Sequence, residues 1–328
     1  MNKKISIVIP VYNEETYLKE VFESLEKQDY DKNLTEIIFV DGNSSDNSEN
    51  ILKEYQLKNS NVKIFANPQK IVPVSMNIGI KNAEGFYIIR MDSHTKYSPD
   101  YVSKCVEVLE KTNADNVGGA IRLIGDNKIQ KAIKLATTCP FGIGNSSFHY
   151  EDFEGYVDTV YLGAYRKDFF YKTGFYDEEL VRNQDDELNY RLIKNGGKIY
   201  MSKEIISYYY PRPSLKKLWK QYYEYGYWKV RVIQKHKFPA SIRHLIPVTF
   251  VLSLLFSFLA LFITKYALIL LFMILFPYFL GLTFFTLKQS LKEKYTNFIT
   301  LASVFIILHL SYGSGFLKGI IDFYVRKK

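Results

Sequence analysis

The sequence IVIPVYNEE at residues 7–15 begins as a β-branched apolar run and ends in a polar turn. Short apolar runs bounded by turn signals are typical of strands that are buried on both faces. Three comparable runs follow at residues 36–40, 62–66 and 85–91, and helical segments are expected between them. Strands that alternate with helices at this spacing predict a doubly wound α/β fold with a mostly parallel sheet.

Asn13 is the expected N-cap of the first helix, because its side chain can accept a hydrogen bond from a free backbone N–H. After the fourth run, the alternation of strands and helices becomes less regular. All these segments together assign residues 1–210 to one α/β domain. Further helices are expected over 48–57, 73–83, 99–112, from 167 and over 184–195, and further strands over 116–123 and 157–165.

Composition excludes two classes of protein. The chain has 328 residues, of which 47% are hydrophobic, and this fraction is too high for a disordered chain. Two cysteines, Cys105 and Cys139, are too few for a disulfide scaffold. Neither cysteine has His or Cys neighbours at metal-ligand spacing, so we expect both to be packing residues.

Three segments in the C-terminal part contain no charged side chain, at residues 245–264, 266–287 and 298–317. Each has about the length of a helix that crosses a bilayer. Residues 245–328 are therefore predicted to be a transmembrane region of two to three hydrophobic helices. The N-terminal apolar run is too short for a signal peptide, so we expect the preceding domain to be cytoplasmic and the protein to be a multi-pass protein of a bacterial-type cell membrane.

The net charge of +9 is concentrated just before these segments. Between Arg212 and Arg243 there are nine Lys or Arg and one acidic residue, interleaved with six Trp or Tyr. Basic and aromatic residues at this place favour contact with anionic membrane lipids and argue against nucleic acid as the partner. Residues 211–244 are predicted to form interfacial helices.

The membrane topology stays open at this stage. Only Lys265 separates the first two apolar segments, which predicts a tight hairpin. A third span would place Arg326 and Lys327 outside, against the positive-inside tendency, so the third segment either spans or is re-entrant or interfacial. His309 within it is either functional or a helix-packing residue.

Polar side chains follow the predicted strands where a doubly wound sheet binds its ligands. Tyr12, Asn13, Asp41 and Asp92 all have such positions. Asp41 suits hydrogen bonds to a base or ribose, or closes a turn with Asn43 or Ser44. Asp92 and His94 suit Mn²⁺ or Mg²⁺ on a diphosphate, or form a surface turn.

An acidic cluster, Asp185-Asp186-Glu187, begins the last helix of this domain. Negative charge at a helix N-terminus complements the helix dipole, and this accounts for part of the cluster. One carboxylate can also act as a general base, because neighbouring negative charge raises its pKa.

Six segments taken together resemble glycosyltransferase family 2, in order and spacing, over residues 4–210. The layout is most similar to membrane-anchored bacterial members that build exopolysaccharide, of the succinoglycan glucosyltransferase type. The resemblance implies a Rossmann-like GT-A fold and inverting sugar transfer from a nucleotide donor, most often a UDP-sugar. The segments are IVIPVYNEE (7–15), VDGNSSDNS (40–48), MNIGIKNAEG (76–85), IIRMDSH (88–94), GAYRKDFFYKTGFYDEEL (163–180) and NQDDELNYRL (183–192).

The resemblance also implies roles for individual residues. Asp92 matches the first acid of the family's DxD metal motif, and His94 replaces the last acid. The family's ED pair falls on Gln184-Asp185, which makes Asp185 the implied general base and Asp186 the second choice. The implied nucleotide-binding residues are Pro10, Val11, Tyr12, Glu14, Asp41, Asn77 and Asp92.

The implied acceptor is a saccharide on a polyprenyl diphosphate in the cytoplasmic leaflet, used in exopolysaccharide or cell-surface glycan synthesis. Gly142, Gly144 and Arg166 are weaker candidates for the acceptor pocket. The family's processive QxxRW motif is altered at Gln221-Tyr222-Tyr223-Glu224-Tyr225, which argues against processive synthesis. Two alternatives are a non-catalytic scaffold of a polysaccharide assembly complex and a sugar nucleotidyltransferase.

Overall fold

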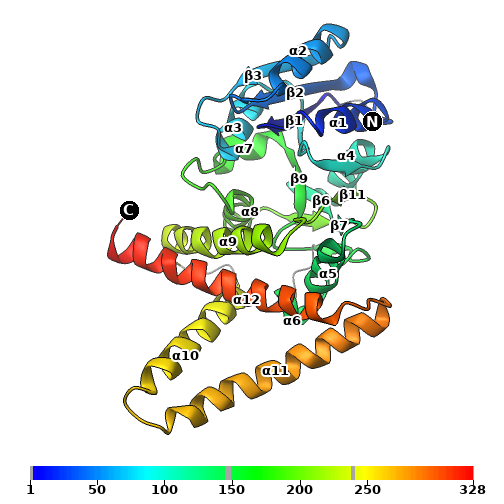
Figure 1. The fold of residues 1–328 in the computed structure, drawn as a ribbon. Helices are drawn as coiled ribbons and strands as arrows, with labels where there is room; N and C mark the ends of the chain where they lie inside the picture. The colour runs from blue at the N-terminus through cyan, green and yellow to red at the C-terminus, as the bar shows by residue number, and fades with distance from the viewer. Residues whose placement is uncertain (1–2, 145–148, 238–240, 328) are drawn as a thin grey trace. The chain divides into compact units, whose positions relative to one another are not determined.

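The computed structural model describes residues 3–144, 149–237 and 241–327 and contains two compact units (Figure 1). The first, here called the sheet unit, comprises residues 1–123 and 147–210. The second, the helical unit, comprises residues 124–146 and 211–328. This division differs from the sequence-based boundary after residue 210, because residues 124–146 pack with the C-terminal helices.

The described part of the sheet unit contains a large sheet with the strand order β3-β2-β1-β4-β9-β6-β10-β8. The first four strands of this order are mutually parallel, as are β6 and β10, whereas β9 runs antiparallel to β4 and β6. The predicted mostly parallel sheet is therefore confirmed for its first half. The strands are β1 Ile5–Val11, β2 Thr35–Asp41, β3 Val62–Ala66, β4 Tyr87–Arg90, β6 Asn116–Gly119, β8 Gly155–Tyr156, β9 Tyr161–Arg166 and β10 Ile199–Met201.

Side-chain alternation along the central strands produces two cores, one on each face of the sheet. Ile7 and Phe39 point into one core, which also contains Leu18, whereas Val8 and Ile38 point into the other. Helices α1, α2 and α4 contribute to the first core and α3, α7 and α8 to the second. These helices are α1 Leu18–Glu26, α2 Ser48–Lys58, α3 Val72–Asn82, α4 Tyr101–Thr112, α7 Lys167–Thr173 and α8 Gln184–Lys194; a 3₁₀ turn, η1, spans Lys32–Leu34.

Two local predictions were wrong. Helix α1 begins at Leu18, and Asn13 adopts a left-handed conformation with φ 55° because its side chain accepts a hydrogen bond from Ser45 N at 2.8 Å. The predicted strand 116–123 is two strands in different sheets, β6 and β7 (Ile121–Leu123). Strand β7 joins β5 (Thr95–Tyr97) and β11 (Ser207–Tyr209) in a small sheet.

The helical unit carries the hydrophobic segments. Within its described residues, three helical stretches are long and apolar enough to cross a membrane, 242–260, 267–292 and 298–325. In the third, His309 bonds to Phe141 O at 2.7 Å and to Tyr278 Oη at 3.0 Å, which supports a helix-packing role. The elements are α5 Lys128–Thr137, α6 Pro140–Ile143, α9 Leu215–His236, η3 Ile242–Leu245, α10 Ile246–Ala260, α11 Ala267–Lys292, α12 Phe298–Ile320 and the π-helix η4 Ile321–Val325.

Candidate active site

Two loops at the carboxyl ends of β1 and β2 are tied together by hydrogen bonds. Ser44 Oγ donates to Asp41 Oδ1 at 2.6 Å and accepts from Asn13 N at 2.9 Å. Ser48 Oγ accepts from Glu14 N at 2.9 Å. Asp41 is buried and closes the turn that the sequence suggested through Ser44. The two loops therefore form one rigid rim beside the ends of the strands.

An exposed aromatic ring lies on this rim. Tyr12 directly follows β1, and its side chain remains 45% exposed. Gly42 lies against the ring, because a Cβ built there would be 3.2 Å from Tyr12 Cδ2. Pro10 and Val11 pair with β2 and support Tyr12 through the backbone, since Val11 O accepts from Gly42 N at 2.7 Å. This arrangement offers a flat surface on which a nucleobase can stack.

The residues predicted to hold a metal lie in the turn after β4. The His94 ring contacts Glu14 Oε1 through Nδ1 at 3.2 Å, which joins this turn to the loop after β1. Asp92 is partly buried, and its N–H donates to Tyr97 Oη at 2.6 Å. Among the residues described, no group of three His, Cys, Asp or Glu side chains is positioned to hold a metal ion.

Two protein ligands nevertheless suit Mn²⁺ or Mg²⁺ in a site completed by phosphate oxygens and water. Asp92 supplies a carboxylate and His94 an imidazole, a pair that matches the preferences of Mn²⁺. Arg90 occupies two acceptor positions of Asp92, but an ionised carboxylate has about four. The donor set therefore fits a divalent cation shared with a diphosphate.

Arg90 is a residue that the sequence analysis missed. It is the last residue of β4, is only 7% exposed, and holds Asp92 through Nε–Oδ1 at 2.9 Å and Nη2–Oδ2 at 3.2 Å. Its guanidinium also interacts electrostatically with Asp185. Burial opposes its charge, but these two carboxylates raise the pKa of Arg90 well above its ordinary value. One cation thus interacts electrostatically with both the predicted metal ligand and the predicted base.

At both Asp92 and Asp185, burial raises the carboxyl pKa and the positive charge of Arg90 lowers it. Burial alone would raise the pKa of Asp92, yet Arg90 and His94 hold it below the ordinary value. At Asp185, burial and the neighbouring Asp186 raise the pKa, although Arg90 acts in the opposite direction. A carboxylate with a raised pKa accepts a proton more readily at neutral pH.

The acidic cluster divides into residues with different surroundings. Asp185 accepts from Asp186 N at 2.9 Å in the first turn of α8. Glu187 is buried and paired with Arg191, with Nη2–Oε2 at 2.8 Å, so it has a structural role. Gln184, which replaces the family's Glu, is also buried, and its Oε1 has no hydrogen-bond partner in the described structure.

Asn77 has the contacts of a residue that positions a neighbouring segment. Its side chain donates to Tyr176 O at 2.9 Å and to Glu178 Oε1 at 2.8 Å, and it accepts from Tyr176 N at 2.9 Å. Asn77 is 3% exposed. It therefore fixes the chain that leads into α8 and the acidic cluster.

Of the weaker candidates for the acceptor pocket, Arg166 lies away from this edge of the sheet. Arg166 pairs with Tyr87 at the start of β4, the opposite end of that strand from Asp92. It donates to Ala114 O at 3.1 Å and to Leu109 O at 2.6 Å. Gly142 and Gly144 belong to the helical unit.

Comparison with known proteins assigns the chain to a family. The family model described as glycosyl transferase family 2 matches residues 6–174. A dolichyl N-acetyl-α-D-glucosaminyl phosphate 3-β-D-2,3-diacetamido-2,3-dideoxy-β-D-glucuronosyltransferase from Methanococcus voltae is 32% identical over 97% of both chains. The succinoglycan biosynthesis protein ExoA of Rhizobium meliloti is 30% identical over 74% of this chain and 73% of its own.

A solved structure has the same fold. The mannosyltransferase of Pyrobaculum calidifontis in complex with GDP-Man and Mn²⁺ matches 98% of this chain and 88% of its own, with a TM-score of 0.63 and 12% identity. This confirms the GT-A fold, and the sequence relatives confirm the enzyme class in place of the scaffold and nucleotidyltransferase alternatives. The chain belongs to glycosyltransferase family 2 and is a glycosyltransferase.

Proposed function

We propose that this enzyme transfers a sugar, with inversion, from a UDP-sugar to a saccharide carried on an isoprenoid phosphate or diphosphate at the cytoplasmic face of the cell membrane. The observation that carries this proposal is that Arg90 is hydrogen-bonded to Asp92 and also interacts electrostatically with Asp185. It joins the residue proposed to face the donor diphosphate to the residue proposed to activate the acceptor.

The donor lies, in this proposal, along the carboxyl edge of the sheet. Tyr12 stacks on the nucleobase, and Asp41, held rigid by Ser44, accepts hydrogen bonds from the base or ribose. Glu14 steadies His94 beside the diphosphate. Asp92 and His94 would hold Mn²⁺ or Mg²⁺, which when bound offsets the negative charge that develops on the leaving nucleoside diphosphate.

Asp185 acts as the general base. It removes the proton from an acceptor hydroxyl while that oxygen attacks the anomeric carbon on the face opposite the leaving group, and the configuration is therefore inverted. Its raised pKa strengthens it as a base, and Arg90 opposes the further rise that burial and Asp186 cause. Asp186 is the second candidate for this role.

The acceptor is proposed from the relative in Methanococcus voltae, whose name specifies a dolichyl-linked sugar phosphate. That relative matches this chain over 97% of its length, including the apolar helices. A membrane-anchored enzyme meets a lipid-linked acceptor without the acceptor leaving the bilayer. The product belongs, in this proposal, to exopolysaccharide or another cell-surface glycan.

Nucleotide release by the purified full-length protein in detergent tests the proposal. A panel of UDP-, GDP- and other nucleotide sugars is supplied with Mn²⁺, with a sugar on either isoprenoid phosphate or isoprenoid diphosphate, or with no acceptor. Asp185→Asn is the control. We expect release from one donor that depends on one acceptor and on Asp185.

Two results would contradict parts of the proposal. Equal release from wild type and Asp185→Asn would place the base elsewhere. Release that is the same with and without each lipid-linked sugar would exclude these acceptors, and a preference for GDP-sugars would exclude the uridine donor.

A further inference from the structure

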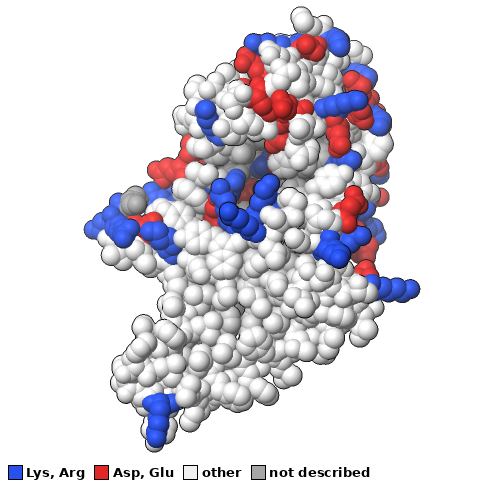
Figure 2. Space-filling view, in the orientation of Figure 1, with Lys and Arg blue, Asp and Glu red and all other residues white. Residues whose placement is uncertain are grey.

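The third apolar helix differs from the other two in how its surface is covered. No residue of α12 between 301 and 320 is exposed. Along α10 and α11, by contrast, large apolar side chains face outward, such as Phe256 at 67% and Phe272 at 62% exposure. In Figure 2 the region of the α10–α11 hairpin is almost free of charged residues except near its tip. The hairpin has an uncovered apolar surface, whereas α12 is covered by protein.

Helix α9 lies against α12 at very short range through glycines. A Cβ on Gly226 would be 2.0 Å from Tyr312 O, and one on Gly315 would be 2.0 Å from Tyr223 O. Farther along, Gln234 Nε2 of α9 donates to Phe323 O at 2.9 Å. The two helices therefore run side by side in the same direction over most of their length (Figure 1).

A second basic helix also packs on α12. Ala132 and Ile133 of α5 share a hydrophobic cluster with Leu301 and Phe305 of α12. Both α5 and α9 also carry several cations, of which Lys229 is buried. These are Lys128, Lys131 and Lys134 on α5 and Lys216, Lys217, Lys220, Lys229, Arg231 and Lys235 on α9.

These neighbours determine where α12 can lie. If α12 crossed the bilayer, α9 beside it would carry six cations into or through the hydrocarbon layer. Each cation near the bilayer centre opposes insertion, and α9 itself contains one acid, Glu224, against its six cations. The apolar surface of α12 is already buried against protein, so it gains little from contact with lipid.

We infer that α10 and α11 are the two membrane spans, and that α9 and α12 lie together at the surface of the anionic leaflet, on the side that holds the sheet unit. An even number of spans brings the chain back to that side after α11. Lys288, Lys292 and Lys294 then share it with Arg326 and Lys327, in agreement with the positive-inside tendency. The lipid partners of the α10–α11 hairpin are acyl chains, and those of α9 are anionic headgroups.

Labelling of single introduced cysteines with a membrane-impermeant maleimide tests this topology in right-side-out and inverted membrane vesicles. The variants are Lys265→Cys at the hairpin tip, Lys294→Cys between α11 and α12, and Lys327→Cys near the C-terminus, all at exposed positions. The wild type is the control, because Cys105 and Cys139 are buried. The readout does not depend on sugar transfer, so it stands apart from the proposed function.

We expect Lys265→Cys to be labelled only in right-side-out vesicles and the other two only in inverted vesicles. Labelling of Lys327→Cys from the outside would overturn the inference, since α12 would then cross. Failure to label Lys265→Cys from the outside would also overturn it, since the hairpin would not cross. If a variant does not accumulate, green fluorescent protein fused to the wild-type C-terminus gives an independent answer: fluorescence supports the inference, and an abundant but dark fusion contradicts it.

Discussion

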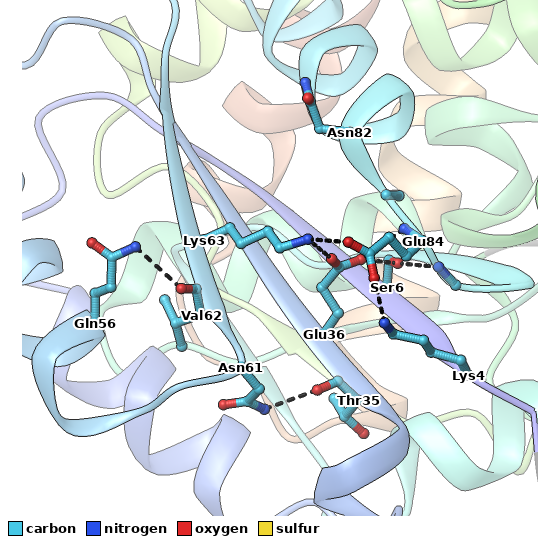
Figure 3. A network of polar contacts seen from close by, with 12 residues as sticks. Lys4, Ser6, Thr35, Glu36, Gln56, Asn61, Val62, Lys63, Asn82 and Glu84 are labelled. Carbon is cyan, nitrogen blue, oxygen red and sulfur yellow. Dashed lines mark hydrogen bonds and ion pairs between the residues drawn. The ribbon is translucent and has the colours of Figure 1, made fainter.

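Carboxylates lie near both ends of the central strands, but the charges around them are arranged differently. Near the amino ends, Glu36 accepts from Ser6 Oγ at 2.5 Å and pairs with Lys63 at 2.6 Å (Figure 3). Lys63 and Lys4 also pair with Glu84, so two cations face two carboxylates. At the carboxyl ends, Arg90 interacts with both Asp92 and Asp185, and Asp186 raises the pKa of Asp185.

The difference appears in the pKa values. Burial would raise the pKa of Glu36, but the Glu84 N–H, Lys63 and Ser6 lower it below the ordinary value. The pKa of Asp185 is raised. At the amino ends, the groups around Glu36 outweigh burial and lower its pKa, whereas at Asp185 burial and Asp186 outweigh Arg90, so this carboxylate takes a proton more readily. Substitutions at the two ends are therefore expected to have separable effects.

The largest effect is expected from Asp185→Asn. The amide keeps the shape of the side chain but cannot accept a proton, so the turnover rate should fall by about 10²–10⁴-fold. Nucleotide binding, followed by calorimetry, should change little. Asp186→Asn is the matched control and should retain most of the activity. If Asp186→Asn lost more of its turnover rate than Asp185→Asn, Asp186 and not Asp185 would be the general base.

Arg90→Gln should have the next largest effect, with turnover reduced by about 10–100-fold, because an interaction with a charged group contributes roughly 1.5–3 kcal/mol. The base must be ionised, so activity falls as the pH drops through the pKa of Asp185. Loss of the cation raises that pKa further, and the acid limb of the pH–rate profile should move to higher pH.

Arg166→Gln provides the control for this substitution, since Arg166 lies at the other end of β4. It should lower the melting temperature by breaking its hydrogen bonds to Ala114 O and Leu109 O, without moving the acid limb. An unchanged acid limb in Arg90→Gln would show that Arg90 does not affect the pKa of the base and has only a structural role.

Tyr12→Ala tests the exposed ring at the carboxyl end. Stacking of a base on an aromatic ring contributes about 1–3 kcal/mol, and the affinity for the nucleoside diphosphate should fall by roughly 5–150-fold. Tyr12→Phe keeps the ring and should bind nearly as well as the wild type. Equal losses in both variants would indicate that the hydroxyl group, and not stacking, makes the contact.

The smallest effect on chemistry is expected at the amino end. Glu36→Gln should destabilise the protein by about 1–2 kcal/mol by removing a charged hydrogen-bond acceptor, while the folded variant keeps its turnover rate. Because the folded pKa of Glu36 is lowered, its contribution is present above the unfolded pKa and is lost as the pH falls through the folded pKa.

Thermal unfolding between neutral and acidic pH measures this contribution. The melting temperatures of wild type and Glu36→Gln should differ most at neutral pH and converge in acid. A difference that does not depend on pH would show that the ion pair with Lys63 contributes nothing to stability.

Local sequence patterns were sufficient for most of the fold and for part of the site. Strands β2 and β3 were predicted within one residue of their bounds, because buried parallel strands are continuous apolar runs. The positions of Asp92 and Asp185 followed from the resemblance to the family. The start of α1 was predicted wrongly, because Asn13 bonds to Ser45, more than thirty residues away.

Arg90 was missed for a related reason. In the segment IIRMDSH, Arg90 resembles an ordinary polar residue at the end of an apolar strand. Asp185, with which it interacts electrostatically, is far away in the sequence. A buried arginine two residues before a predicted metal ligand was the available signal. The covering of α12 was equally unpredictable, since hydropathy does not distinguish a helix that faces lipid from one that faces α5 and α9.

The insertion of residues 124–146 into the helical unit has a practical consequence for protein production. The chain passes between the two units three times, after residues 123, 146 and 210. A truncation at residue 210 would keep α5 and α6 but remove the helices against which Ala132, Ile133 and Cys139 are buried. Such a fragment would expose these apolar side chains to water and would tend to aggregate. A soluble form therefore requires replacement of residues 124–146 by a short polar linker as well as removal of the C-terminal helices.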